Sequence, residues 1–176
     1  IGKPALLQLQ QADGSHRPLH GRITAAERIG SNGGLARYRL RLQPWLAFLS
    51  QRVDSYVFHD KTVVEIIEDI FADYGTLAPE WRWVLTDASQ YAKRSLTTQY
   101  RESDLAFVQR LLAEEGIFYW FEHEGDVEAS AFGKHALVFA DHSHDVTDLG
   151  SVRFHRRDES ERSDTVQRWQ EGRRWC

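Results

Sequence analysis

Residues 100–121 read YRESDLAFVQRLLAEEGIFYWF, and this stretch decides the fold. Ser103 is a typical N-cap, because its hydroxyl can accept a hydrogen bond from a free N–H of the first helical turn. Asp104 follows at the positive end of the helix dipole. Gly116 can adopt the left-handed conformation that ends a helix. We therefore predict a strand, a capped helix over residues 103–115, a glycine stop and a second strand.

The helix and the strand after it both carry apolar surface. Apolar side chains of the helix recur at steps of three and four residues, which places them on one face: Leu105, Phe107, Val108, Leu111 and Leu112. The strand at residues 117–121 has apolar residues on both of its faces. Such a strand is predicted to lie in the middle of a sheet or under a helix, and not at an open edge.

The same stretch resembles the hub domain of VgrG proteins. These are the spike proteins of bacterial type VI secretion machines, and they are similar to the tail-hub proteins of contractile phages. The resemblance rests on an ordered motif to which we assign a structural role: Tyr100, Arg101, Glu102, Ser103, Asp104, Phe107, Leu111, Leu112, Glu115 and Gly116. It continues in residues 38–46, YRLRLQPWL, and residues 58–67, FHDKTVVEII. It covers most of the chain but only part of a VgrG protein.

The bulk composition is ordinary for a globular protein. The 176 residues are 41% hydrophobic and 27% charged, with a net charge of −4. That charge gives no nucleic-acid-binding footprint, and no apolar run approaches the roughly 18 residues of a membrane helix. The single cysteine, Cys176, excludes an internal disulfide. The chain starts without a signal-peptide pattern and contains no methionine, so we expect a processed product or an excised fragment.

The first part of the chain alternates in the manner of β-hairpins. Strands are expected at residues 5–11 and 19–29, and residues 35–42 alternate cleanly. Tyr38 and Leu40 fall on one face of this last strand and arginines fall on the other. The pattern predicts a half-buried antiparallel strand. Successive hairpins suggest a barrel or a sandwich.

The middle of the chain adds helices to the strands. Residues 61–74 are typical of an amphipathic helix, in which Thr62 and Glu65 form a capping-box pattern and Gly75 is the expected stop. A short helix is expected at residues 45–50. Further strands are expected at residues 55–59, 79–84, 97–100, 136–140, 151–155 and 165–170.

These segments predict an α+β protein with two kinds of sheet. A β-barrel-like part is built from hairpins, and a mixed sheet is packed with two amphipathic helices, as in phage tail hubs. The expected parts are barrel-like strands at 1–57, an α+β hub subdomain at 58–150, and strands at 151–176 that return to the barrel. The segment order alone supports α+β, whereas the barrel is implied mainly by the resemblance.

Two pairs of residues that are close in the sequence are candidates for a metal site or for an acid/base pair. His142 and His144 would point the same way in an extended segment and could bind a transition ion, but we prefer a solvated loop. Glu114 and Glu115 are adjacent on a helix and point apart, so they are poorly placed as an acid/base pair.

The remaining candidates are weaker. Glu122 and Glu124 could share a strand face, but their place at a hairpin mouth favours solvation. Cys176 is terminal and has no evident catalytic partner. The last stretch mixes acidic residues with many arginines, which suits solvent or a protein partner better than a phosphate backbone: Arg153, Arg156, Arg157, Arg162, Arg168, Arg173 and Arg174. We therefore predict no catalytic residue, no metal site and no cofactor.

The resemblance implies a structural function. VgrG hubs form a homotrimer at the tip of the injection tube, where they sit on a hexameric tube protein of the Hcp type and carry the spike. Three chains with two related barrel-like domains each would match a six-fold tube. Effector or adaptor proteins would bind through the missing C-terminal part. Such a protein resides in the bacterial cytoplasm before firing and is then secreted or delivered into target cells, with no nucleic-acid binding and no membrane insertion by this segment.

Two alternatives remain open at this point. The first is the tail hub or baseplate protein of a contractile phage or a phage-derived tail. The second is a cell-wall hydrolase attached to a tail, which would need an acid/base pair in a cleft. Activity on purified peptidoglycan separates the hydrolase from both hub interpretations, since a hub should have none.

Overall fold

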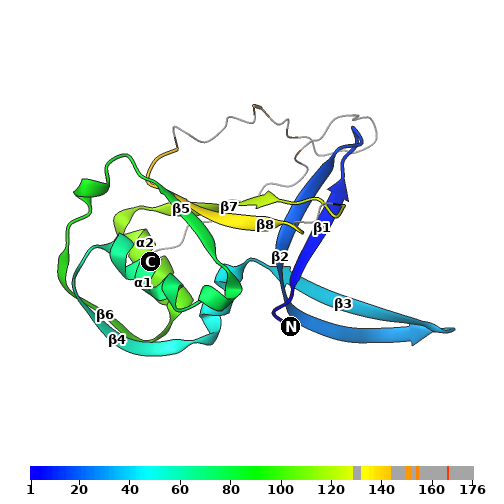
Figure 1. The fold of residues 1–176 in the computed structure, drawn as a ribbon, viewed down its shortest axis with the longest axis horizontal. Coiled ribbons are helices and arrows are strands. Elements are labelled where there is room, and N and C mark those ends of the chain that lie inside the picture. Colours follow the sequence, from blue (N-terminus) through cyan, green and yellow to red (C-terminus); the bar gives the residue numbers. More distant parts are fainter. Residues whose placement is uncertain (129–131, 144–149, 152–153, 155–165, 167–176) are drawn as a thin grey trace. The chain divides into compact units, whose positions relative to one another are not determined.

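Figure 1 shows the computed structural model of the chain. The structure describes residues 1–128, 132–143, 150–151, 154 and 166. The chain divides into two compact units, Ile1–His142 and Ser143–Cys176.

The described residues of the second unit include one parallel bridge, between Phe154 and Val166. The strands expected at residues 151–155 and 165–170 lie mostly outside the described residues. The return of this segment to a barrel therefore stays a prediction.

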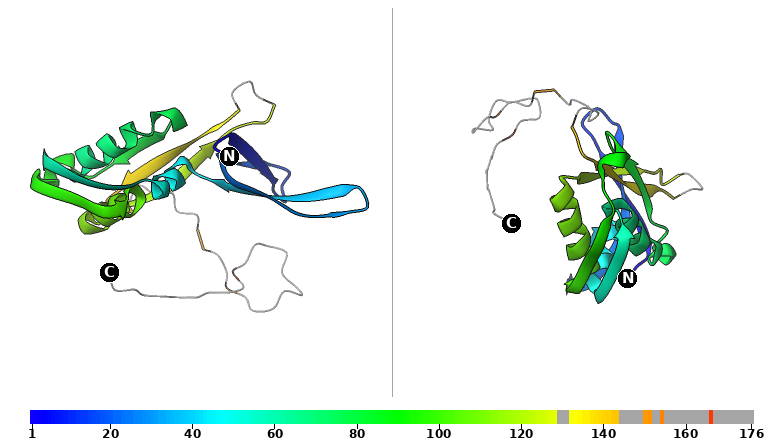
Figure 2. Two further views of the ribbon diagram at one scale, coloured as in Figure 1. Left: turned by 90° about the horizontal axis from the view of Figure 1, so that it is seen from below. Right: turned by 90° about the vertical axis from the view of Figure 1, so that its left-hand side faces the viewer.

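The first unit begins with a three-stranded antiparallel sheet, as the predicted hairpins require. Its strands are β1 (Pro4–Gln10), β2 (His16–Asn32) and β3 (Leu35–Gln43), paired in that order. β1 pairs with the first half of β2, and β3 pairs with the second half. Residues 25–32 and 35–41 thus form a two-stranded segment, here called the ribbon, which extends away from the helices (Figures 1 and 2).

Two more sheets accompany the helices. β4 (Val53–Lys61) and β6 (Arg94–Ser103) form an antiparallel pair. β5 (Glu80–Val84), β8 (Lys134–Ala140) and β7 (Phe118–Glu124) form a mixed sheet in that order, with β5 parallel and β7 antiparallel to β8.

Two α-helices complete the unit, α1 (Val63–Ala72) and α2 (Asp104–Glu115). Three short 3₁₀ helices join the larger elements: η1 (Trp45–Gln51), η2 (Gly75–Leu77) and η3 (Ala88–Gln90). The predicted α+β class, with a mixed sheet and two amphipathic helices, is confirmed. Within the described residues, no helix has the length and apolar character needed to cross a bilayer.

Both α-helices begin with the caps that the sequence predicts. The hydroxyl of Thr62 accepts from the N–H of Glu65 at 3.1 Å, and the Glu65 carboxylate accepts from the N–H of Thr62 at 2.7 Å. The hydroxyl of Ser103 accepts from the N–H of Ala106 at 3.2 Å. Gly116 ends α2 with φ of 70°, a left-handed conformation that a side chain would strain.

The first helix ends earlier than predicted. α1 stops at Ala72, and Gly75 opens η2 instead of reversing the chain. The N–H of Leu77 donates to the carbonyl of Tyr74 at 2.8 Å, which continues a tight right-handed turn. The left-handed residue is Ala78, with φ of 45°, so the chain reverses three residues later than the position of Gly75 suggested.

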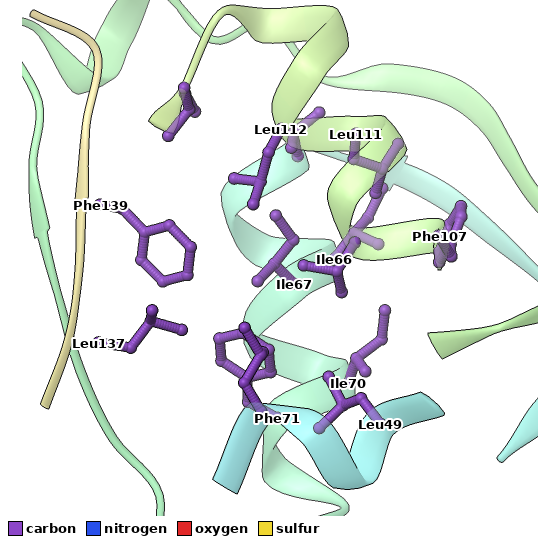
Figure 3. Packing of buried hydrophobic residues seen from close by; sticks show 14 of the residues in the cluster. Leu49, Ile66, Ile67, Ile70, Phe71, Phe107, Leu111, Leu112, Leu137 and Phe139 are labelled. Atoms are coloured by element: carbon purple, nitrogen blue, oxygen red, sulfur yellow. The ribbon is translucent and has the colours of Figure 1, made fainter. Parts of the chain in front are cut away.

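The core lies where the two helices meet the mixed sheet. Figure 3 shows α1 and α2 facing Leu137 and Phe139 of β8. The residues at this contact are fully or almost fully buried: Ile66, Ile67, Ile70, Phe71, Phe107, Leu111, Leu112, Leu137 and Phe139. Phe107 also stacks on Phe58 of β4 at a centroid distance of 5.8 Å. One core therefore ties the β4–β6 pair to the mixed sheet through the helices.

Of the two positions predicted for the strand after Gly116, the middle of a sheet is wrong. The other, against a helix, agrees with the hydrogen bond from Nε2 of Gln109 in α2 to the hydroxyl of Tyr119 at 3.1 Å. β7 lies at an edge of the mixed sheet as described, and the central strand is β8. The apolar residues of β7 divide between its two faces. Tyr119 and Phe121 pack against the core, whereas Phe118 and Trp120 stack on each other at 5.9 Å, with Phe118 partly exposed.

Candidate assembly surface

The motif that carried the resemblance spans the junction of β6, α2 and the turn before β7. Its apolar members Phe107, Leu111 and Leu112 are buried in the core, and Ser103 and Gly116 cap the two ends of α2. Most of the motif thus builds the scaffold. The structure gives its polar members different roles.

Asp104 has no exposed surface, although the sequence placed it only as a favourable charge at a helix start. Its Oδ2 accepts from Nε of Arg52 at 2.6 Å and from the hydroxyl of Tyr74 at 2.7 Å. Its Oδ1 accepts from Nε2 of Gln99 at 2.8 Å. Arg52 also donates to Asp73 at 2.7 Å. A buried carboxylate is tolerable here because each oxygen is hydrogen-bonded and a cation lies beside it.

The same contacts fix the protonation of the groups around Asp104. Burial, together with the hydrogen bond to the Asp104 carboxylate, raises the pKa of the Tyr74 phenol far above its usual value. Burial disfavours the charge on Arg52, but its hydrogen bond to Asp73 and its pairing with Asp104 outweigh burial and raise its pKa. The cluster therefore holds a neutral phenol and a permanent cation, which suits a structural joint and not proton transfer.

The two glutamates at the end of α2 share one cation. Arg94 reaches Glu114 at 2.6 Å and Glu115 at 2.5 Å, so the adjacent carboxylates converge on one guanidinium where the sequence suggested that they point apart. Arg110 joins Glu102 at 2.6 Å and Glu114 at 3.1 Å. The hydrogen bond from Arg94 lowers the pKa of Glu114. An ionised, paired carboxylate is a poor general acid.

The other sequence candidates are not brought together in the described residues. Glu122 forms a two-point ion pair with Arg82, both contacts at 2.7 Å, whereas Glu124 is 3.8 Å from Lys134. Nε2 of His142 lies 3.8 Å from Oδ1 of Asp141. The Asp141 carboxylate also accepts hydrogen bonds from Thr86, Gln90 and Tyr91.

Several candidates fall beyond the part of the chain that can be described. His144, Cys176 and the arginine-rich stretch lie outside the described residues. Among the residues that are described, no group of three or more His, Cys, Asp or Glu side chains could hold a metal ion.

The start of the motif is on the surface. Tyr100 is 66% exposed, and the guanidinium of Arg101 lies over its ring at 5.4 Å. Arg101 has φ of 50°, opposite the register shift between Asp54 and Ser55. Its N–H donates to the hydroxyl of Ser55 at 3.2 Å, which holds this bulge. Tyr100 points outward by the normal alternation of β6, in which Thr97 and Gln99 are buried and Thr98 and Tyr100 are exposed. Its aromatic side chain is therefore available to a partner.

The ribbon carries the largest departure from the sequence prediction. β3 was predicted to be half-buried, yet its residues from Leu35 to Arg41 are exposed on both faces. Tyr38 is 66% exposed and Leu40 is 60% exposed. Their cross-strand partners are Arg28 and Ala26, so these four residues lie on one face of the ribbon.

The opposite face of the ribbon is charged. Arg39 pairs with Glu27 at 2.7 Å, and Arg37 and Arg41 alternate with it along β3. The alternation is thus that of a strand with one covered face, but nothing in the described residues covers the apolar one. A two-stranded ribbon is marginally stable by itself, so a cover for this face would stabilise it.

The comparisons with known proteins agree with this reading of the fold. A family model described as the phage tail baseplate hub matches residues 1–175. The chain belongs to that family.

Curated proteins similar to this chain include type VI secretion system spike proteins of Pseudomonas aeruginosa. VgrG1b is 37% identical over 141 residues, which are 80% of this chain and 18% of VgrG1b. VgrG4b is 40% identical over 121 residues, which are 69% of this chain and 15% of VgrG4b. The actin cross-linking toxin VgrG1 of Vibrio cholerae is 33% identical over 149 residues, 85% of this chain and 13% of that protein. The chain spans less than a fifth of each of them.

A solved structure shows the same fold. It is the E. coli c3393 protein, described as a component of the type VI secretion system with structural similarity to the bacteriophage T4 tail proteins gp27 and gp5. The TM-score is 0.62 at 30% identity, over 76% of this chain and 35% of that chain. The resemblance to VgrG hubs and the hub-like fold are confirmed.

Proposed function

We propose that this chain is part of a type VI secretion spike hub that assembles as a homotrimer. Its parent protein sits on a hexameric tube protein and carries the spike, and effector or adaptor proteins bind through regions outside this chain. It resides in the cytoplasm before firing and is then delivered into target cells. The family and the relatives' names support this function.

The observation that carries the proposal is the apolar face of the ribbon, which no other part of the described chain covers. Tyr38 and Leu40 lie on an extended two-stranded element whose other face is charged. Exposed apolar surface rimmed by polar residues marks an interaction site, and in a homotrimer a neighbouring copy supplies the cover.

Two other functions fit the observations less well. A phage baseplate hub shares the family, but the spike-protein relatives favour type VI secretion. A cell-wall hydrolase needs two facing carboxylates, whereas Glu114 and Glu122 are each engaged by an arginine. We expect no activity of the chain on purified peptidoglycan.

The test is the solution mass of the full-length parent by light scattering behind a sizing column. We expect a trimer, and a parent that stays monomeric across a concentration series would overturn the proposal. The double variant Tyr38→Ser/Leu40→Ser should lower the trimer fraction. The matched variant Arg37→Ser/Arg41→Ser, on the opposite face, should leave it unchanged. A trimer that survives both would keep the hub but place its interface elsewhere.

A further inference from the structure

Three histidines from three strands meet where the first sheet contacts the mixed sheet. His20 lies on β2, and His123 and His135 are cross-strand partners on β7 and β8. The ring centroids of His20 and His135 are 5.1 Å apart, and those of His123 and His135 are 5.8 Å apart. The chain position of these residues gave no sign of this cluster, because it is assembled by long-range pairing.

The hydrogen bonds of the cluster assign one tautomer to each ring. The main-chain N–H of Trp45 donates to Nε2 of His135 at 3.0 Å, so the proton of a neutral His135 is on Nδ1. Nδ1 of His135 is 2.8 Å from Nδ1 of His20, which must then accept. The main-chain N–H of His20 donates to Nδ1 of His123 at 3.2 Å. His20 and His123 therefore carry their protons on Nε2.

A second proton on any of the three rings would break one of these bonds. On His135 the added proton would convert Nε2 from an acceptor into a donor that faces the N–H of Trp45. On His123 it would do the same to Nδ1, which faces the main-chain N–H of His20. On His20 it would set two N–H groups against each other at 2.8 Å. Each protonation thus replaces an attraction by a repulsion between donors, in a place where His135 is only 5% exposed.

The charged groups around the cluster oppose protonation more than they favour it. From β2, Arg17 and Arg22 repel a cation on the rings, and from β5 Glu80 attracts one on His20. Lys134 lies 3.4 Å from Glu80, which reduces the attraction of that carboxylate, and 3.8 Å from Glu124 of β7.

Burial is the largest cause of the altered titration. Burial first, and then the neighbouring His20, His123 and Arg22, lower the pKa of His135 to about 4. Burial also lowers the pKa of His20 and of His123. Water can still reach the cluster, because His20 and His135 line a cavity of about 210 Å³ with Glu80 and Lys134.

We propose that His20, His123 and His135 form an acid-sensitive joint that holds the first sheet on the mixed sheet at neutral pH and loosens in mild acid. The direction follows from linkage. The folded pKa lies below the unfolded value of about 6.5, so the unfolded or opened state binds more protons. The joint is therefore complete above about pH 6.5 and weakens as the pH falls below that value.

The first test is the ring tautomer in the intact chain at pH 7.5, from the nitrogen chemical shifts of the imidazoles. We expect Nδ1–H on His135 and Nε2–H on His20 and His123. The second test is hydrogen exchange at pH 7.5 and 5.5, corrected for intrinsic rates. The main-chain N–H groups of Trp45 and His20 should lose protection, whereas that of Leu111 in α2 should keep it.

Variants separate the joint from general acid effects. The double variant His20→Gln/His123→Gln keeps neutral hydrogen-bonding side chains, and it should lose about half or more of the shift in urea midpoint between pH 7.5 and 5.5. His59→Gln, on the exposed surface of β4, should keep the full shift. An unchanged shift in the double variant, other tautomers, or equal loss of protection in α2 would overturn the proposal.

Discussion

Nε of Arg52 lies 2.6 Å from Oδ2 of Asp104, a carboxylate with no exposed surface. The contact joins the start of β4 to the start of α2, and the main-chain N–H of Asp104 also donates to the carbonyl of Arg52 at 3.0 Å. Asp104 therefore ties the hub motif to the rest of the core, in addition to its favourable position at the positive end of the helix dipole.

Replacing Asp104 by Asn should lower the free energy of unfolding by about 3 kcal/mol, because it removes one partner of a buried ion pair. The amide keeps the volume, but its NH₂ group would face donors from Arg52, Tyr74 or Gln99. Urea denaturation at pH 7 measures the change. Asp73→Asn is the matched control on the same arginine. Its carboxylate is exposed, so it should cost less than about 1 kcal/mol, and equal losses would contradict the role of burial.

Replacing Gly116 by Ala should lower the free energy of unfolding by about 1–2 kcal/mol, since φ of 70° places a Cβ close to the following carbonyl. Beyond the adjacent backbone, no atom lies within 4 Å of the added Cβ, so the cost is conformational and not a clash with packed side chains. Gly75→Ala is the control. It has the same open space without a positive φ, and should be neutral or stabilising by about 0.5 kcal/mol. Thermal unfolding of both variants measures the difference. Equal destabilisation of the two variants would contradict the conformational explanation.

Features that depend on nearby residues were predictable from the sequence. The caps at Thr62 and Ser103 and the stop at Gly116 each involve groups within a few residues of one another. The apolar face of α2 follows from its spacing, because a helix has a fixed period. These local rules, with the family motif, were sufficient to predict the α+β class and the hub resemblance.

Features that depend on distant pairing were not predictable. The edge position of β7 follows from a strand order that places β8 between β5 and β7. Asp104 is buried because Arg52, Tyr74 and Gln99 converge on it from other elements.

The exposure of Tyr38 has a different cause. Its alternating strand does have one apolar face, as predicted, but no cover for that face lies in the described residues.

Replacing Arg94 by Gln should cost about 1 kcal/mol in low salt, and less in high salt, because Arg94 bridges Glu114 and Glu115 in a partly exposed pair of contacts. The two carboxylates also lie at the negative end of the α2 dipole, where the arginine offsets their repulsion. Urea denaturation at two salt concentrations measures the change. A loss that salt leaves unaltered would point to packing of the arginine stem instead.

The same pair should also contribute to the pH dependence of stability. The contact with Arg94 lowers the folded pKa of Glu114, so the folded state binds fewer protons than the unfolded one near that pKa. The stabilisation is present above the unfolded value of about 4.3 and disappears as the pH falls through the folded value. Arg94→Gln should therefore reduce the loss of stability below about pH 4.3. An unchanged acid limb in this variant would show that the pair is not formed in solution.

Replacing Leu111 by Ala should lower the free energy of unfolding by about 2–5 kcal/mol, because the side chain is fully buried between α1 and the rest of the core and its removal leaves a cavity. Leu96→Ala is the matched control, with the same atoms removed from a side chain that is 59% exposed, and should change stability by less than about 0.5 kcal/mol. Urea denaturation measures both changes, from the shift in midpoint when the dependence of the unfolding free energy on urea concentration is the same. If the two variants were destabilised equally, the helix face predicted from the spacing of the motif would not be the face that packs on α1.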